Sequence, residues 1–204
     1  WVEIDLNAIH QNMLSTKAML HPNCKVLAVV KADAYGHGAV QVAKTVLRSG
    51  ADYLGVASVD EGIELRKAGI GAPILIFSEP PYASIPLLLA YNIMPSIFTV
   101  EFAVQYGEAA DSVGLRAPYH LKVNTGMNRI GVRFDEVVDF LKRISFHRAL
   151  DLIGTYTHFA TADTSEAMEF RIQQNHFNEA LDKMRDVGID PGIIHAANSA
   201  AIIR

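Results

Sequence analysis

The segment VLAVVKADAYGHG (residues 26–38) is the part of the sequence that decides the fold. Its first five residues are all apolar, which is typical of a strand buried on both faces of a parallel sheet. Lys31 follows at once, and Gly36 and Gly38 then permit a tight turn into a helix that we expect to start near Gly38. A strand that leads through such a turn into a helix is one βα unit.

The same rhythm continues along the 204 residues, because apolar, β-rich runs alternate with segments of helical period. An open doubly wound sheet is the alternative, but no GxGxxG motif follows the first strand. Since a complete barrel takes about 250 residues, the sequence predicts an α/β fold, a (β/α)8 TIM-type barrel with about seven units present and the eighth missing. The expected strands are Val26–Val30, Tyr53–Val56, Ile74–Phe77, Ile93–Ser96, Tyr119–Val123, Leu152–Thr157 and Ile193–Ala196, with an extra β-rich run at Val2–Leu6.

Three helices are clear from their periodicity: Val59–Ala68, Phe134–Ile144 and Ser165–Val187. Ser165 is the expected N-cap of the third. The segment after Phe77 is expected to be the least regular, because it contains Pro80, Pro81 and Pro86.

Composition excludes several classes of function. The formal net charge of -4 argues against nucleic acid or an anionic membrane as the main partner. No apolar run is long enough to span a membrane, and no signal peptide is visible, so we expect a cytoplasmic protein. Cys24 is the only cysteine, and none of the eight histidines shows metal-ligand spacing, so no metal site is expected.

Polar residues follow several of the expected strands, where both α/β architectures place their sites. Taken singly, each has an ordinary explanation, such as a lysine with its head in water or a surface arginine. Together they converge on one barrel mouth and indicate a site for an anionic, aldehyde-like cofactor. The residues are Lys31, Lys122, Arg129, His158, Asn198 and Ser199.

These residues also lie in motifs of a known family. The segment Val29–Gly38 closely resembles the pyridoxal phosphate (PLP) lysine signature of alanine racemases. Lys122–Gly131 resembles a second motif of that family, and Tyr156–Ala160 and His195–Ser199 resemble a third and a fourth. The resemblance spans the whole chain in the expected order, so residues 1–204 are expected to be the PLP-binding barrel domain.

The resemblance implies an enzyme, a PLP-dependent isomerase that interconverts L- and D-alanine and supplies D-alanine for peptidoglycan. Lys31 is then the catalytic residue, which holds PLP and moves a proton at the substrate Cα. Tyr35 and Ser199 bind the phosphate beside Asn198, and His158 lies against the pyridine ring. Arg129 contacts the PLP phenolic oxygen and the substrate carboxylate, and a carbamylated Lys122 holds Arg129 in place.

The sequence departs from the family pattern at Asn124, where the family usually has Asp, which we expect to weaken only a local hydrogen bond. The family's ring-nitrogen arginine, its second catalytic base and its C-terminal β domain are expected to lie after Arg204. The chain alone is therefore expected to be inactive, and the full-length protein is expected to be a homodimer. The alternatives are a racemase or decarboxylase for another amino acid, a non-catalytic PLP carrier, and an unrelated sugar-phosphate barrel.

Overall fold

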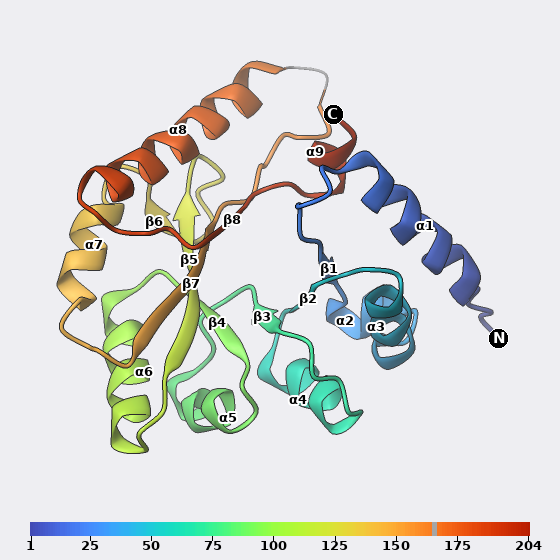
Figure 1. Ribbon diagram of the computed structural model, residues 1–204, viewed down its shortest axis with the longest axis horizontal. Helices are drawn as coiled ribbons and strands as arrows, with labels where there is room; N and C mark the ends of the chain where they lie inside the picture. Colours follow the sequence, from blue (N-terminus) through green and yellow to red (C-terminus); the bar gives the residue numbers. More distant parts are fainter. Residues whose placement is uncertain (165–166) are drawn as a thin grey trace. The chain divides into compact units, whose positions relative to one another are not determined.

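The computed structural model describes residues 1–164 and 167–204, and the chain forms two compact units, Trp1–Pro95 and Ser96–Arg204 (Figure 1). Strand β4 (Met94–Ile97) spans the boundary between them. Each unit consists of parallel strands with helices between them, as the sequence pattern predicts.

The first unit contains three strands and the start of β4, paired in chain order. Ala28 is in register with Leu54, Gly55 with Leu75, and Ile76 with Pro95. Its elements are α1 (Leu6–Met19), β1 (Leu27–Val29), α2 (Lys31–Gly36), α3 (Ala39–Arg48), β2 (Tyr53–Val56), α4 (Val59–Lys67), β3 (Ile74–Ile76), the 3-10 turn η1 (Tyr82–Ser84) and α5 (Ile85–Ala90).

The second unit continues the parallel pairing from β4 through β5 and β7 to β8, and the short β6 pairs with β5 beside this path. The register between β5 and β7 shifts, because Tyr119 pairs with Leu152 and His120 pairs with Gly154, which leaves Ile153 of β7 as the extra residue. Its elements are α6 (Val100–Ser112), β5 (Ala117–Asn124), β6 (Val132–Arg133), α7 (Val137–Ile144), β7 (Leu150–Tyr156), α8 (Ala167–Asp186), β8 (Ile193–His195) and α9 (Ser199–Ile203).

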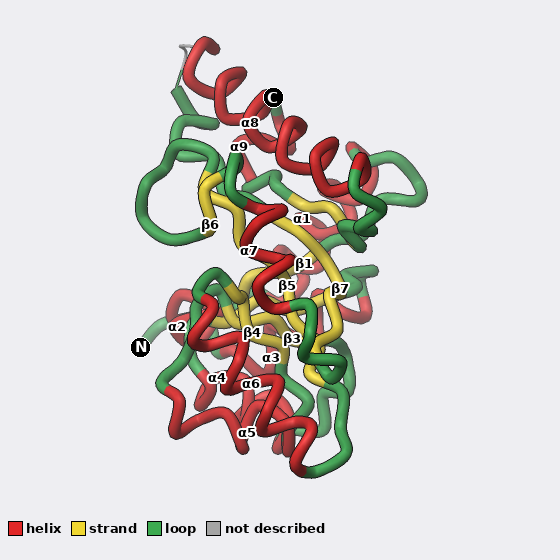
Figure 2. The backbone as a smooth tube through the Cα atoms, turned by 90° about the vertical axis from the view of Figure 1, so that its left-hand side faces the viewer, coloured by secondary structure: helices red, strands yellow, loops and turns green. Residues whose placement is uncertain are grey.

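The helices bury the faces that their sequence pattern predicts. Helix α7 buries Val137, Phe140, Leu141 and Ile144, which recur at helical spacing. Helix α8, the long helix in Figure 2, buries Phe177, Leu181 and Met184. Strand β3 is wholly apolar and buried, with Ile74, Leu75 and Ile76 all at 0% exposure, which is typical of a parallel sheet covered on both faces.

The strand order confirms the predicted fold class. An open doubly wound sheet reverses its strand order at a switch point. Here β1 to β5, β7 and β8 are neighbours in chain order, with a helix between each strand and the next, which is the topology of an incomplete (β/α)8 barrel. All seven expected strands are present, and each end lies within two residues of its predicted position.

The structure corrects the prediction in two places. The run Val2–Leu6 is not a strand, because the Asp5 carboxylate accepts hydrogen bonds from the backbone N–H groups of Asn7 (2.8 Å) and Ala8 (3.2 Å) and so starts helix α1 at Leu6. The helix expected from Phe134 begins only at Val137. The expected cap Ser165 lies outside the described residues, and α8 is described from Ala167.

The proline-rich segment behaves as expected, since it forms only η1 and the six-residue α5, with Pro86 in the first turn. Among the helices of the described residues, none has the length and apolar character needed to cross a membrane.

Candidate functional site

Lys31 stands directly after the buried end of strand β1 in the first unit. Val30 before it is 1% exposed, and the Lys31 side chain is half-buried. Its Nζ lies 5.9 Å from the centre of the Tyr35 ring, and Tyr35 itself is exposed. Lys31 forms none of the ion pairs found within the described residues, so its amine is not neutralised by a fixed carboxylate. The structure thus brings together two of the predicted site residues, Lys31 and Tyr35.

The turn between Lys31 and Gly36 is left-handed. Four consecutive residues, Ala32 to Tyr35, have φ values of 51–58° and ψ values of 35–53°. Left-handed conformation costs about 1–2 kcal/mol for each residue with a Cβ. A run of four is therefore strained, and such strain persists only where the surrounding structure fixes it. Helix α3 then begins at Ala39 with Gly38 as its N-cap residue, which confirms the predicted helix start.

Two carboxylates hold this turn. Glu61 Oε1 accepts the Ala32 N–H at 2.8 Å, while its Oε2 accepts the N–H groups of Ala57 (2.7 Å) and Ser58 (3.3 Å). Asp33 Oδ1 accepts the Ala39 N–H at 2.6 Å and so supplies the first turn of α3 with a cap from six residues upstream. The turn is therefore tied to the helices that follow β1 and β2.

Glu61 is a site-supporting residue that the sequence analysis did not single out. Its signal is the capping box formed by Ser58 and Glu61, a common start of a helix. Nothing in that motif indicates that the same carboxylate also holds the peptide after Lys31, because this contact joins residues 29 positions apart.

In the second unit, Lys122 is buried inside strand β5, with 3% of its surface exposed. Its Nζ donates to the backbone carbonyl of Val123 at 3.2 Å, and it joins no ion pair within the described residues. Burial, and to a smaller extent the nearby charge of Arg129, lower the pKa of Lys122 to about 7. A lysine with this pKa is in part a neutral amine at neutral pH. It lies near Arg129, the residue with which the sequence-based prediction pairs it.

Arg129 lies on the loop between β5 and β6 and is exposed. Burial raises the pKa of Tyr156, and the charge of Arg129 offsets a part of that rise. The loop is shaped by Asn124, whose side-chain oxygen accepts the N–H groups of Gly126 (3.1 Å) and Asn128 (3.0 Å). Asn128 has a φ of 56°, a conformation that asparagine tolerates better than most residues. The asparagine at position 124 therefore still closes the turn that carries Arg129.

A buried aromatic cluster lies beside Lys122. The Tyr156 ring stacks on His195 with 4.6 Å between centroids and 7° between planes, and the Tyr156 hydroxyl is 2.6 Å from Ser96 Oγ. His195 Nε2 lies 2.8 Å from His120 Nδ1. An added Cβ at Gly154 would lie 2.8 Å from His120 Nδ1, so only glycine leaves room for that ring.

Burial of these rings shifts their pKa values. It lowers the pKa of His120 from 6.5 to about 4. Burial also lowers the pKa of His195 to about 3, aided by the neighbouring His120 and Lys122. The residue His195 as a whole keeps some exposure, but its ring is enclosed by Tyr156 and His120. Both histidines are thus neutral near pH 7, and one donates a hydrogen bond to the other. This pair cannot be found from the sequence alone, because its two histidines are 75 positions apart and meet only through the placement of β5 and β8.

The remaining predicted residues lie on two further loops of the second unit. His158 is half-buried after β7. Asn198 is the N-cap of α9, where its oxygen accepts the Ala201 N–H at 3.0 Å and its amide donates to the Phe159 carbonyl at 3.2 Å. Ser199 is the exposed first residue of α9. The Asn198 bond therefore joins the loop that carries Ser199 to the loop that carries His158.

The donor set fits an anionic cofactor with an aldehyde, which is what the sequence resemblance implies. A buried cation needs a counter-charge, and Lys122 has no carboxylate partner within the described residues. Arginine, asparagine and serine side chains suit phosphate or carboxylate oxygens. The described residues contain no cluster of three or more His, Cys, Asp or Glu that could hold a metal ion.

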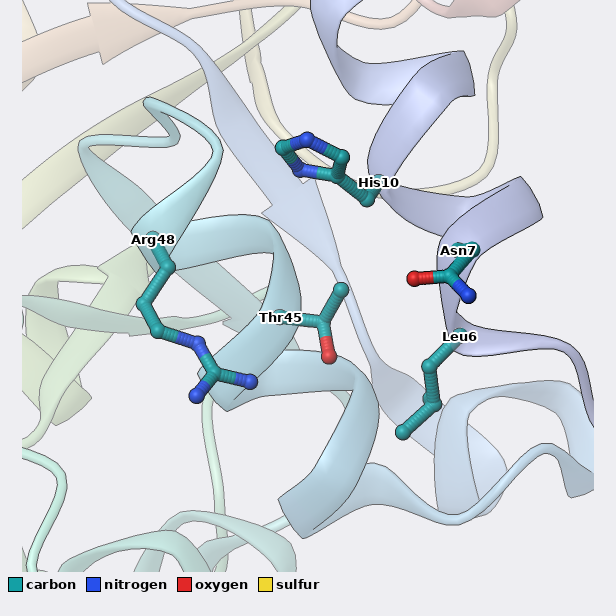
Figure 3. Close-up of a pocket in the computed structure, with 5 residues that line it drawn as sticks. All are labelled: Leu6, Asn7, His10, Thr45 and Arg48. Atoms are coloured by element: carbon teal, nitrogen blue, oxygen red, sulfur yellow. The ribbon is translucent and has the colours of Figure 1, made fainter.

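A separate pocket of about 310 Å³ lies in the first unit between α1 and α3 (Figure 3). It is lined by helix residues, Leu6, Asn7, His10, Thr45 and Arg48. It contains none of the predicted site residues and lies on helices rather than at the carboxyl ends of strands, where barrel sites form.

Comparison with known proteins identifies the family. Residues 4–204 match the model of the family "Alanine racemase, N-terminal domain". The chain is 40% identical over 203 residues to the alanine racemase of Halothermothrix orenii and 40% identical over 204 residues to that of Methanococcus maripaludis. All of this chain but only 54% and 55% of those proteins is matched, so the chain spans about half the length of these curated relatives.

Solved structures give the same result. The crystal structure of alanine racemase from Bacillus anthracis with bound L-Ala-P has a TM-score of 0.94 and 40% identity, and the match covers 100% of this chain and 53% of that one. An alanine racemase of Clostridium difficile 630 has a TM-score of 0.96 and 38% identity, over 99% of this chain and 56% of that one. The chain therefore belongs to the alanine racemase N-terminal domain family, a family of pyridoxal phosphate-dependent isomerases.

Proposed function

We propose that this chain is the cofactor-binding barrel of an alanine racemase, and that the whole protein interconverts L-alanine and D-alanine. The observation that carries the proposal is Lys31, in a motif at the carboxyl end of β1, in a chain that matches alanine racemases along its whole length. The Bacillus anthracis relative binds L-Ala-P, which is consistent with an alanine-sized substrate.

PLP, when bound, withdraws electrons from the amino-acid substrate and acidifies its Cα–H bond. Lys31 would hold the cofactor through its Nζ and carry a proton to and from one face of Cα. A lysine can do this only when its amine is deprotonated for part of the time. The Tyr35 ring centre lies 5.9 Å from Lys31 Nζ, and the left-handed turn between them would help to direct the lysine side chain.

The second unit would hold the rest of the ligand. Ser199 and Tyr35 would bind the phosphate with Asn198 beside them, and His158 would lie against the pyridine ring. Arg129 would bind the phenolic oxygen and the substrate carboxylate, for which its planar fork of donors is suited.

Lys122 would be carbamylated. Its neutral amine attacks carbon dioxide, one N–C bond forms, a proton leaves and a negative carbamate results. That charge would pair with Arg129 and would remove the cost of a buried cation.

Racemisation needs a base on each face of Cα, and the described residues offer no second base beside Lys31. We therefore propose that the second base, the partner of the ring nitrogen and a C-terminal β domain lie outside this chain, and that the chain alone is inactive. We propose further that the whole protein is a cytoplasmic homodimer whose D-alanine enters peptidoglycan.

The test is covalent trapping of PLP on the full-length protein with borohydride, followed by peptide mapping and a D/L-alanine exchange assay. We expect a visible absorbance band that becomes fixed on the peptide containing Lys31, and racemisation of alanine. Lys31→Ala should abolish both, while Lys44→Ala, which changes an exposed lysine of α3, should alter neither. Trapping on Lys31 without alanine turnover would indicate another PLP enzyme, and no band would overturn the proposal.

A further inference from the structure

One side chain of helix α8 holds both ends of the loop that carries Arg129. His176 Nδ1 lies 2.9 Å from the Thr125 carbonyl oxygen, and since a carbonyl only accepts, the histidine is the donor. The His176 ring also stacks on Phe134, with 3.9 Å between centroids and 4° between planes. Thr125 opens the segment that contains Arg129 and Phe134 closes it, so His176 fixes the segment at both ends.

A second side chain of the same helix holds the loop that carries His158. Gln173, one helical turn before His176, is 5% exposed. Its Oε1 accepts the Ala160 N–H at 3.0 Å, and its Nε2 donates to the Thr161 hydroxyl at 3.4 Å. An added Cβ at Gly126 would lie 3.2 Å from Gln173 Cγ, so Gln173 also packs against the Arg129 loop.

The loop that carries Arg129 and the loop that carries His158 are also joined directly by hydrogen bonds. The Thr157 hydroxyl donates to the Val123 carbonyl at 3.0 Å and lies 2.8 Å from the Thr125 hydroxyl, which must therefore donate to it. Both threonines are buried, since Thr125 is 1% exposed and Thr157 is 3% exposed. Arg129 and His158 thus belong to one hydrogen-bonded block that rests on two polar residues of α8.

We propose that Gln173 and His176 are positioning residues, the α8 latch, which set the places of His158 and Arg129 for the reaction. Polar side chains on the buried face of a helix lose contact with water, so their hydrogen bonds must be made within the protein. Here both are used to hold loops. The consequence for catalysis rests on the proposed function, whereas the hold on the two loops does not.

The first test is hydrogen exchange of the full-length protein, read by mass spectrometry. His176→Phe keeps a ring for the stack on Phe134 but removes the donor, and Gln173→Met keeps the side-chain length but removes both bonds. We expect about three- to tenfold faster exchange, the size of one net hydrogen bond, in residues 124–134 for His176→Phe and in 157–164 for Gln173→Met. Gln174→Met, the same change at the exposed next residue, should leave both segments unchanged.

The second test is steady-state kinetics with alanine. We expect His176→Phe to raise KM about three- to tenfold with a smaller change in kcat, because the Arg129 loop would bind the substrate carboxylate less well. His176→Asn, which restores a donor at a similar position, should recover most of the loss. A purely structural role would lower the thermal midpoint and the active fraction but leave KM unchanged.

The outcomes separate the two proposals. Unchanged exchange in both loops of the latch variants would overturn the latch, whatever the activity. Faster exchange together with unchanged KM would overturn its role in positioning Arg129. A wild-type protein without alanine turnover would contradict the proposed function, while the exchange experiment would still decide on the latch.

Discussion

The Lys122 side-chain nitrogen lies 5.0 Å from the centre of the Tyr156 ring, whose hydroxyl is 2.6 Å from Ser96. A ring face is an attractive neighbour for an ammonium group, but it does not replace the water that Lys122 loses inside the sheet. Among the residues that the structure describes, the lysine has one carbonyl and one ring as partners, and Arg129 is a neighbouring like charge. Because the buried Lys122 amine has so few partners, we expect it to be chemically modified.

We expect Lys122 to form a carbamate in the full-length protein. In carbon-13 NMR with labelled carbon dioxide, a carbamate signal should be present in the wild type and absent in Lys122→Met. Loss of a charged partner of Arg129 should lower kcat/KM about 10- to 100-fold, as expected for a hydrogen bond to a charged group. Lys67→Met, which changes an exposed lysine, is the control. A carbamate signal that persists in Lys122→Met would contradict the prediction.

Stability should fall as the pH falls below 6.5, the ordinary histidine pKa, because His120 and His195 titrate in the folded state only near pH 4 and 3. A lowered pKa in the folded state means that the unfolded chain binds protons more readily. The contribution of the pair is therefore complete above pH 6.5 and is lost progressively toward the folded pKa values.

Thermal unfolding of the full-length protein between pH 7 and pH 4 checks this expectation. His195→Asn should flatten the acid limb of the stability curve relative to the wild type, whereas His21→Asn, at an exposed position, should not. If the stability of the wild type and of His195→Asn falls equally between pH 7 and pH 4, the histidine pair does not control acid stability.

A substitution by glycine should stabilise the left-handed turn, whereas it destabilises a normal helix. Ala32→Gly relieves a left-handed residue that costs about 1–2 kcal/mol and loses less than that in chain entropy, so the free energy of unfolding should rise slightly. Ala8→Gly, in the regular helix α1, should lower it by about 1 kcal/mol. We expect Ala32→Gly to reduce kcat, because the Lys31 side chain is then less firmly directed. Denaturant titration and kinetics measure the two effects, and destabilisation by Ala32→Gly would refute the strain.

Glu61 should matter more than an ordinary helix cap. Glu61→Ala removes the acceptor of three backbone N–H groups, one of them next to Lys31, and should cost about 2–4 kcal/mol of stability at roughly 1 kcal/mol per hydrogen bond. It should also weaken PLP binding, measured by titration of the visible band. Glu64→Ala, on the exposed side of α4, provides the comparison, and equal effects of the two changes would exclude the anchoring role.

Much of the fold could be predicted, because parallel strands are short apolar runs and the helices between them keep a regular period. The run Val2–Leu6 misled the prediction, because its β-branched residues suit a strand while Asp5 decides the local structure by capping α1. Proline explains why α5 is short.

Within the site, the motif residues could be named from the sequence, but their supports could not. Glu61, Gln173 and His176 act across 29, 13 and 51 positions of sequence, a separation that periodicity does not report. The sequence does give one sign of the role of Gln173, because it is a polar residue on the apolar face that Phe170 and Phe177 define. Such residues merit a search for partners.

The turn after Lys31 also bears on the order in which the protein matures. Alanine and tyrosine resist left-handed backbone, so a nascent chain has little tendency to adopt the turn by itself. Glu61 can hold the turn only when α4 has formed, and Asp33 can hold it only when α3 has formed. We therefore expect the geometry around Lys31 to form late in folding, after α3 and α4 are in place.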